Sequence, residues 1–90
     1  PSLVVWGGEE DFAYEQNFHT LATSMIDALL DRGHFLATCN HNTGHEIPPG
    51  AWSWVFEFLL AHDKQTGTDS PYAGGLPDSF PQYCSVSDAQ

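Results

Sequence analysis

The chain has 90 residues, which is enough for one domain or for part of one. Its formal net charge is −10, and Arg32 and Lys64 are its only basic residues apart from histidine. This excludes nucleic acid as a partner and disfavours an anionic membrane surface, because both require clustered cations. Three Trp and six Phe in a composition that is 41% hydrophobic indicate a folded protein.

The first residues have the pattern of a buried strand. The chain begins at Pro1 without an initiator Met, so we expect it to be the C-terminal part of a longer protein. No apolar run approaches the roughly 20 residues of a membrane-spanning helix. Residues 3–6 form a continuous apolar run, which is typical of a strand buried on both faces in a parallel sheet. Gly7 and Gly8 end the run, and three acidic residues follow, Glu9, Glu10 and Asp11.

A helix is predicted over residues 17–32. Its apolar residues fall on one stripe at helical spacing, namely Phe18, Leu21, Ala22, Met25, Ile26, Leu29 and Leu30. Asn17 can cap the N-terminus, and Gly33 can adopt the left-handed conformation that ends a helix.

A second strand and a second helix follow. Residues 35–39 form a short apolar run, and residues 51–62 have an apolar stripe that includes Trp52. Trp54 lies off this stripe. We therefore expect Trp52 in the core and Trp54 either at the rim of a cleft or on a partner surface.

The order strand, helix, strand, helix over residues 1–62 predicts an α/β fold with parallel strands. Two parallel strands alone are not a stable sheet, so we expect further strands beyond those that this chain supplies. Periodicity stops after residue 62, and glycines and prolines interrupt the remainder. Residues 63–90 are predicted to form an irregular tail that packs on the surface through its aromatic side chains.

Two chemically suited residues follow the two predicted strands. Asp11 and His45 lie in the loops after residues 3–6 and 35–39, so parallel pairing would bring both to the carboxyl edge of the sheet. A carboxylate beside an imidazole fixes its tautomer and stabilises the imidazolium that forms on proton uptake. Glu9 and Glu10 are the alternatives for the acid.

A metal site is the less favoured interpretation of the histidine loop. His41, His45 and Glu46 are metal-ligand types, but Gly44 and Pro48 make this segment a loop and not a helix face. No second pair of ligands stands out in the sequence. We therefore predict no metal and no cofactor.

Both segments resemble those of a known family. Val5-Trp6-Gly7-Gly8-Glu9-Glu10-Asp11 is similar to the acid segment of α/β-hydrolase esterases, and Asn42-Thr43-Gly44-His45-Glu46-Ile47-Pro48 is similar to their histidine loop. The order of the two motifs, with one helix and one strand between them, also agrees with that family. The resemblance covers roughly residues 3–62 and is closest to secreted esterases of the polyhydroxyalkanoate-depolymerase and feruloyl-esterase type.

The family's nucleophile is missing. It lies on a Gly-x-Ser-x-Gly turn between a strand and a helix, and no serine of this chain has that context. The segment of the oxyanion hole is also absent. The resemblance therefore implies the C-terminal β-α-β-α portion of an α/β-hydrolase, with Asp11 and His45 present and the serine upstream.

This resemblance implies a carboxylic ester hydrolase in which His45 is the general base and Asp11 orients it. Its partners would be an ester substrate and the N-terminal remainder of the hydrolase domain, and its location would be secreted or periplasmic. The isolated chain would be inactive. The alternatives are a peptidase of the same fold and a non-catalytic fragment or binding module.

The two cysteines, Cys39 and Cys84, are the final feature of the sequence. An even number of cysteines in a chain of secreted type predicts a disulfide between them. Two reduced, buried thiols are the alternative.

Overall fold

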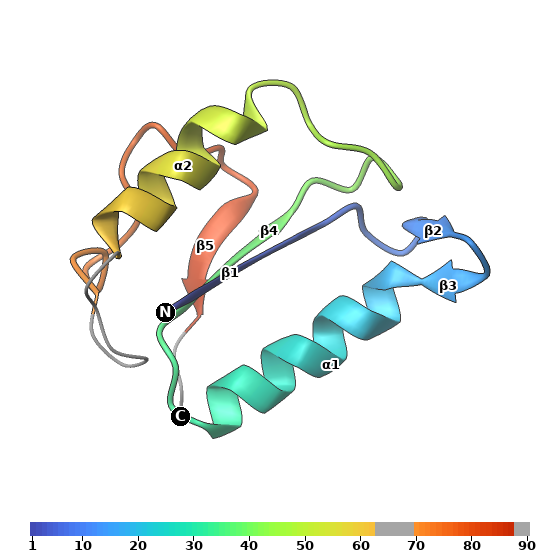
Figure 1. The fold of residues 1–90 in the computed structure, drawn as a ribbon, viewed down its shortest axis with the longest axis horizontal. Helices are drawn as coiled ribbons and strands as arrows, with labels where there is room; N and C mark the ends of the chain where they lie inside the picture. The colour runs from blue at the N-terminus through green and yellow to red at the C-terminus, as the bar shows by residue number, and fades with distance from the viewer. Residues whose placement is uncertain (63–69, 88–90) are drawn as a thin grey trace.

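A computed structural model describes residues 1–62 and 70–87 of the chain. It contains five strands and two α-helices in these ranges (Figure 1). In chain order they are β1 (Ser2–Trp6), β2 (Phe12–Ala13), β3 (Gln16–Asn17), α1 (Phe18–Asp31), β4 (Leu36–Asn40), α2 (Ala51–Ala61) and β5 (Cys84–Ser87).

The main sheet has the order β1-β4-β5. β1 and β4 are parallel, in a register that runs from Ser2 opposite Leu36 to Trp6 opposite Asn40. The prediction of two adjacent parallel strands is therefore confirmed. The loops that leave β1 and β4 both start at the carboxyl edge of this pair, because the paired strands run in the same direction.

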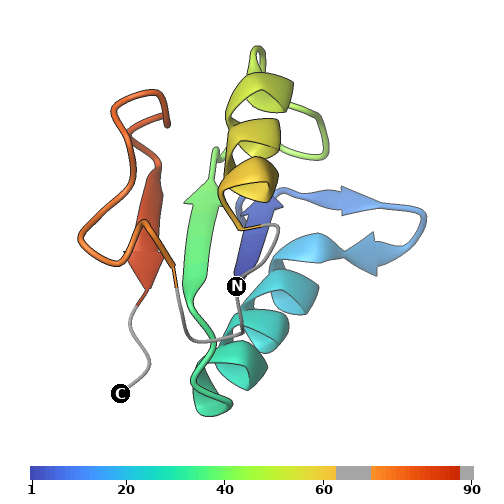
Figure 2. The same ribbon diagram turned by 60° about the vertical axis from the view of Figure 1, so that its left-hand side comes forward.

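The two helices cover opposite faces of the sheet, as Figures 1 and 2 show. Successive side chains of β4 alternate between these faces. Ala37 and Cys39 belong to a core cluster with α2, and Leu36 belongs to a second, smaller cluster with Ala22 of α1. The sheet is thus the middle layer of three, which is the arrangement expected for an α/β fold.

The prediction for the tryptophans of α2 is wrong. Trp54 is buried at 4% exposure, while Trp52 is 59% exposed. Trp54 packs against Phe80 and Tyr83 of the C-terminal segment, with ring centroids 5.6 and 6.3 Å apart. The helix is apolar on nearly all sides, so its own periodicity does not identify the buried face. The aromatic side chains of the tail select the face that carries Trp54.

The prediction of an irregular tail and an entirely parallel sheet requires correction. β5 pairs antiparallel with β4, which makes the sheet mixed. A disulfide joins Cys39 of β4 to Cys84 of β5, as predicted, and holds the two strands together at one end of their pairing. The strand is short and follows a run rich in Gly and Pro, so its pairing depends on this contact with β4 and not on its own pattern. Residues 63–69 and 88–90 of the predicted tail lie outside the described residues.

The outer edge of β1 has no neighbouring strand among the described residues. Large apolar side chains are exposed on both sides of this edge, on α1, on α2 and in the loop before α2. They include Leu21, Met25, Ile47, Trp52 and Phe56, each with about half or more of its surface exposed. This exposed apolar surface therefore follows the outer edge of β1.

No helix in residues 1–62 or 70–87 is long and apolar enough to cross a membrane.

Candidate active site

Asp11 is held in a tight turn directly after β1. Its Oδ2 accepts a hydrogen bond from the backbone N–H of Gly7 at 2.8 Å, and its own N–H donates to the carbonyl of Gly8 at 3.1 Å. The residue is only 5% exposed. A buried carboxylate needs such partners, because removing an unpaired charge from water is costly. The turn thus fixes the position of the Asp11 carboxylate independently of its contact with His45.

The loops after β1 and β4 are in direct backbone contact. The N–H of Gly44 donates to the carbonyl of Gly7 at 3.0 Å. A Cβ atom at Gly7 would lie 1.8 Å from the carbonyl oxygen of Gly44, which is an impossible distance for non-bonded atoms. Glycine at position 7 is therefore required for this approach, and the approach brings the next residue, His45, to Asp11.

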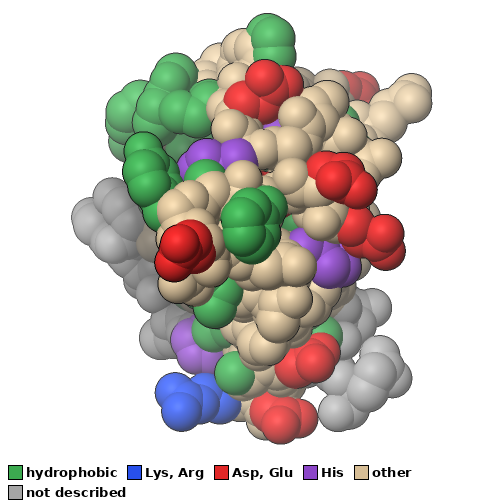
Figure 3. Space-filling view, turned by 90° about the vertical axis from the view of Figure 1, so that its right-hand side faces the viewer, with side chains coloured by type: hydrophobic (Ala, Val, Ile, Leu, Met, Phe, Trp, Pro, Cys, Tyr) green, Lys and Arg blue, Asp and Glu red, His purple; other side chains and the backbone are tan. Residues whose placement is uncertain are grey.

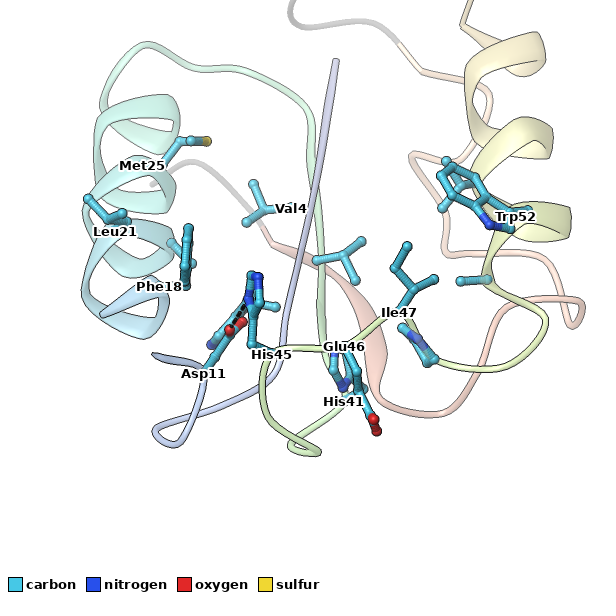
Figure 4. Close-up of a pocket in the computed structure, with 16 residues that line it drawn as sticks. Val4, Asp11, Phe18, Leu21, Met25, His41, His45, Glu46, Ile47 and Trp52 are labelled. Carbon is cyan, nitrogen blue, oxygen red and sulfur yellow. Dashed lines mark hydrogen bonds and ion pairs between the residues drawn. The ribbon is translucent and has the colours of Figure 1, made fainter. Parts of the chain in front are cut away.

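The Nδ1 atom of His45 lies 2.8 Å from Oδ1 of Asp11 (Figure 4). The expectation that parallel pairing brings both residues to the carboxyl edge of the sheet is confirmed. An ionised carboxylate can only accept, so the proton of the neutral imidazole is assigned to Nδ1, which leaves the lone pair on Nε2. The side chain of His45 is 46% exposed, whereas that of Asp11 is 7% exposed. No hydrogen bond to Nε2 is found within residues 1–62 and 70–87.

A third residue, Phe18, contacts both members of the pair. Its ring stacks on the imidazole of His45, with centroids 4.6 Å apart and planes inclined by 18°. Its backbone N–H donates to the carbonyl of Asp11 at 2.8 Å. The apolar pattern of the sequence places Phe18 only on the stripe of the first helix and does not indicate this role.

A short hairpin brings Phe18 to this position. β2 and β3 pair antiparallel, and the two residues between them, Tyr14 and Glu15, have φ angles of 52° and 63°. Two consecutive left-handed residues are the geometry of a type I′ turn. The residues usual for this turn, Asn and Gly, are absent, so the sequence contains no signal for the hairpin.

The pair lies at one end of a groove of about 660 Å³, which we call the edge groove. Figure 4 shows β1 between α1 on one side and α2 on the other, with Asp11 and His45 at the end of the strand. The groove is largely apolar, and its floor and walls include Val4, Val5, Leu21, Met25, Trp52 and Val55. The open side of His45 therefore faces an apolar space next to the edge of β1, which has no partner strand among residues 1–62 and 70–87.

The other candidate residues have no comparable contacts. Glu9 and Glu10 are exposed, and the structure pairs His45 with Asp11 instead. His41 lines the edge groove and bonds through Nδ1 to Thr43 Oγ1. Within the described part of the chain, no three His, Cys, Asp or Glu side chains come together as metal ligands. Figure 3 shows acidic side chains scattered over this end of the molecule, with histidine and apolar side chains between them.

This arrangement can accept and return a proton at Nε2 of His45. Asp11 stabilises the imidazolium that forms on protonation, because its carboxylate lies at hydrogen-bond distance from Nδ1. The described residues supply no serine hydroxyl that bonds to Nε2. Comparison of the chain with protein-family models, curated proteins and solved structures finds no match.

Proposed function

We propose that this chain supplies the acid and the base of a serine esterase with an α/β-hydrolase fold, resembling polyhydroxyalkanoate depolymerases and feruloyl esterases. The observation that carries the proposal is the 2.8 Å contact between Asp11 Oδ1 and His45 Nδ1, at the carboxyl edge of two adjacent parallel strands. The residue types, their order and this geometry together meet the requirements for a triad that lacks only its nucleophile.

The proposed reaction has two halves. In the first, Nε2 of His45 takes the proton of a serine hydroxyl while the serine oxygen attacks the ester carbonyl, and the imidazolium then gives that proton to the departing alcohol. In the second, His45 takes a proton from water while the water oxygen attacks the acyl-enzyme, and the imidazolium then returns this proton to the serine oxygen as the acid leaves. Asp11 remains ionised throughout and holds the imidazole in the tautomer with its proton on Nδ1.

The serine is assigned to the N-terminal remainder of the hydrolase domain. The open edge of β1 supports this assignment, because a strand edge exposes backbone N–H and C=O groups that a further strand can pair with. The apolar walls of the edge groove support it as well, since strands buried between two helical layers have apolar side chains on both faces. The proposed partner strand would thus cover Leu21, Met25 and Trp52.

The disulfide between Cys39 and Cys84 fits a protein that folds in an oxidising compartment. We therefore place the esterase outside the cytoplasm, either secreted or periplasmic. The preference for an ester over a peptide bond depends on the resemblance alone, since the triad geometry is common to both reactions.

The test is steady-state kinetics on the full-length protein that contains this chain. With p-nitrophenyl esters, the variant His45→Ala is expected to lower kcat by about 10⁴ or more, because the serine loses its base. Asp11→Asn is expected to be nearly as severe, since an amide favours the wrong tautomer of His45. A matched p-nitroanilide substrate compares amide with ester cleavage in the same assay.

Glu10→Gln is the matched control, because it makes the same chemical change on the exposed carboxylate next to Asp11. Its kcat is expected to remain within about twofold of the wild-type value. If Asp11→Asn retained near wild-type kcat while Glu10→Gln lost it, Glu10 would be the acid. Cleavage of the anilide well above the buffer rate would favour the peptidase, whereas activity confined to the ester would favour the esterase.

A further inference from the structure

Phe18 is fixed more firmly than an ordinary residue on the face of a helix. It is the first residue of α1, and the preceding Asn17 caps that helix by accepting a hydrogen bond from the N–H of Thr20 at 3.1 Å. Its own N–H donates to the carbonyl of Asp11 at 2.8 Å. This bond extends the ladder of the hairpin by one pair, beyond Phe12 opposite Asn17. The ring of Phe18 therefore has a defined position relative to the acid.

This position places a flat aromatic surface against one face of the His45 imidazole. The ring centroids are 4.6 Å apart and the planes are within 18° of parallel. The hydrogen bond to Asp11 fixes one edge of the imidazole, but rotation about that bond would still move Nε2. A ring stacked on the imidazole face opposes this rotation, so the two contacts together determine the direction of Nε2.

The stack also affects the charged form of His45. The face of an aromatic ring carries partial negative charge and attracts a cation that lies within about 6 Å of its centroid. An imidazolium stacked at 4.6 Å satisfies this condition. Removal from water disfavours a charged imidazole, so stabilisation of the cation must come from direct contacts and not from burial. The ring face of Phe18 and the carboxylate of Asp11 thus both favour the protonated form of His45.

We propose that Phe18 is a positioning residue that holds the imidazole of His45 in its working orientation and stabilises the imidazolium through its π face. The catalytic part of this inference rests on the esterase proposed above, whereas the contact itself does not. Phe18→Leu keeps an apolar side chain but removes the π face, and Phe18→Tyr keeps the π face. Phe12→Leu, on the exposed β2, makes the same change at a residue where no contact with His45 is found.

The contact is tested by proton NMR of the full-length protein. The ring current of Phe18 is expected to shift the His45 ring protons upfield in the wild type, in Phe18→Tyr and in Phe12→Leu. In Phe18→Leu these protons are expected to return downfield, with the rest of the spectrum unchanged. Identical His45 shifts in Phe18→Leu and in the wild type would overturn the inference, because the rings would then not be stacked.

The role is tested by ester kinetics on the same four proteins. Phe18→Leu is expected to lower kcat by about 5- to 10-fold with KM unchanged, as loss of a cation–π contact implies, and Phe18→Tyr is expected to restore it. In an active enzyme, an effect below twofold, or one confined to KM, would overturn the role of Phe18 alone. A wild-type protein without esterase activity would overturn the proposed function and this role together, even with the ring-current shift present.

Discussion

At the scale of single residues, the site depends on a contact between two backbones as much as on the acid and the histidine. Gly7 and Gly44 bring the loops after β1 and β4 into hydrogen-bond contact at 3.0 Å. The same Gly7 donates its N–H to the Asp11 carboxylate at 2.8 Å. One glycine thus determines both the position of the acid and the approach of the histidine loop.

Gly7→Ala is therefore expected to separate the two loops. The new methyl group would meet the carbonyl oxygen of Gly44 at 1.8 Å, and backbone atoms on both sides prevent a simple side-chain adjustment. We expect a loss of about 1 to 3 kcal/mol or more in the free energy of unfolding, measured with urea, together with a fall in kcat.

Gly74→Ala is the control for this substitution, because a Cβ at Gly74 meets nothing within 4 Å. Its effect on stability is expected to remain within about 0.5 kcal/mol. Equal stability of Gly7→Ala and Gly74→Ala would show that the two loops do not touch as described.

At the scale of elements, the hairpin formed by β2 and β3 links the acid to α1. Its turn places two residues other than glycine, Tyr14 and Glu15, at φ angles of 52° and 63°. A left-handed conformation costs an L-residue roughly 1 to 2 kcal/mol relative to its preferred regions. The hairpin therefore retains some strain while it holds Asp11 and Phe18 next to His45.

Glu15→Gly is expected to relieve part of this strain. Glycine adopts positive φ without a steric cost, so the free energy of unfolding should rise by up to about 1 kcal/mol. Glu9→Gly removes the same charge from an exposed position where φ is not positive, and there glycine should be neutral or destabilising. Thermal unfolding of both variants compares their melting temperatures. A lower melting temperature for Glu15→Gly than for Glu9→Gly would contradict the turn geometry.

The disulfide connects the C-terminal segment to the centre of the sheet. Cys39 lies in β4 and Cys84 in β5, with a sequence separation of 45 residues. For a closed segment of this length, the chain-entropy model gives a stabilisation of about 4 kcal/mol, as an upper figure. Without the bridge, the segment that buries Trp54 would be held by its packing, by the short β5 ladder and by hydrogen bonds such as that of Ser79 Oγ to the Glu57 carboxylate at 2.8 Å.

Replacement of both cysteines by alanine is expected to lower the free energy of unfolding by up to about 4 kcal/mol. Urea unfolding of the oxidised wild type and the double variant measures this difference. Thiol titration of the unreduced, denatured wild type should detect no thiol from Cys39 or Cys84. Titration of both thiols in that sample would disprove the bridge.

The elements that were predicted well are those with strong local patterns. The strands β1 and β4 and the helix α1 follow continuous or periodic apolar runs, and the positions of Asp11 and His45 follow from parallel pairing of those strands. The contact between these residues was predictable because the carboxyl ends of adjacent parallel strands meet at one edge.

The features that were missed depend on contacts between distant segments. The buried face of α2 is decided by Phe80 and Tyr83, which pack on Trp54, and neither residue has a pattern that predicts this contact. β5 has only four residues and follows a run rich in Gly and Pro. The stacking of Phe18 on His45 requires a hairpin whose turn lacks the usual Asn and Gly.

At the scale of the whole molecule, exposed apolar surface borders the open edge of β1. The edge groove lies along this edge, and His45 lies at its end with no hydrogen bond to Nε2 within residues 1–62 and 70–87. The net charge of −10 opposes close contact between two copies of the chain. These features fit the proposal that a further part of a hydrolase domain covers the edge groove.

The isolated chain of 90 residues is accordingly expected to be inactive. It should hydrolyse p-nitrophenyl esters no faster than buffer, and a fluorophosphonate probe should label none of its serines, because the proposed nucleophile is not among them. Esterase activity that is lost on His45→Ala in this chain alone would contradict the assignment of the serine to another segment.

The central claim is that Asp11 and His45 activate a serine that lies outside these 90 residues. It is tested most directly by treating the full-length protein with a fluorophosphonate probe and mapping the labelled peptide by mass spectrometry. We predict stoichiometric labelling of one serine in a Gly-x-Ser-x-Gly sequence upstream of Pro1, with labelling abolished by His45→Ala. Labelling of any serine between Ser2 and Ser87, or no labelling of the folded wild-type protein, would contradict the account.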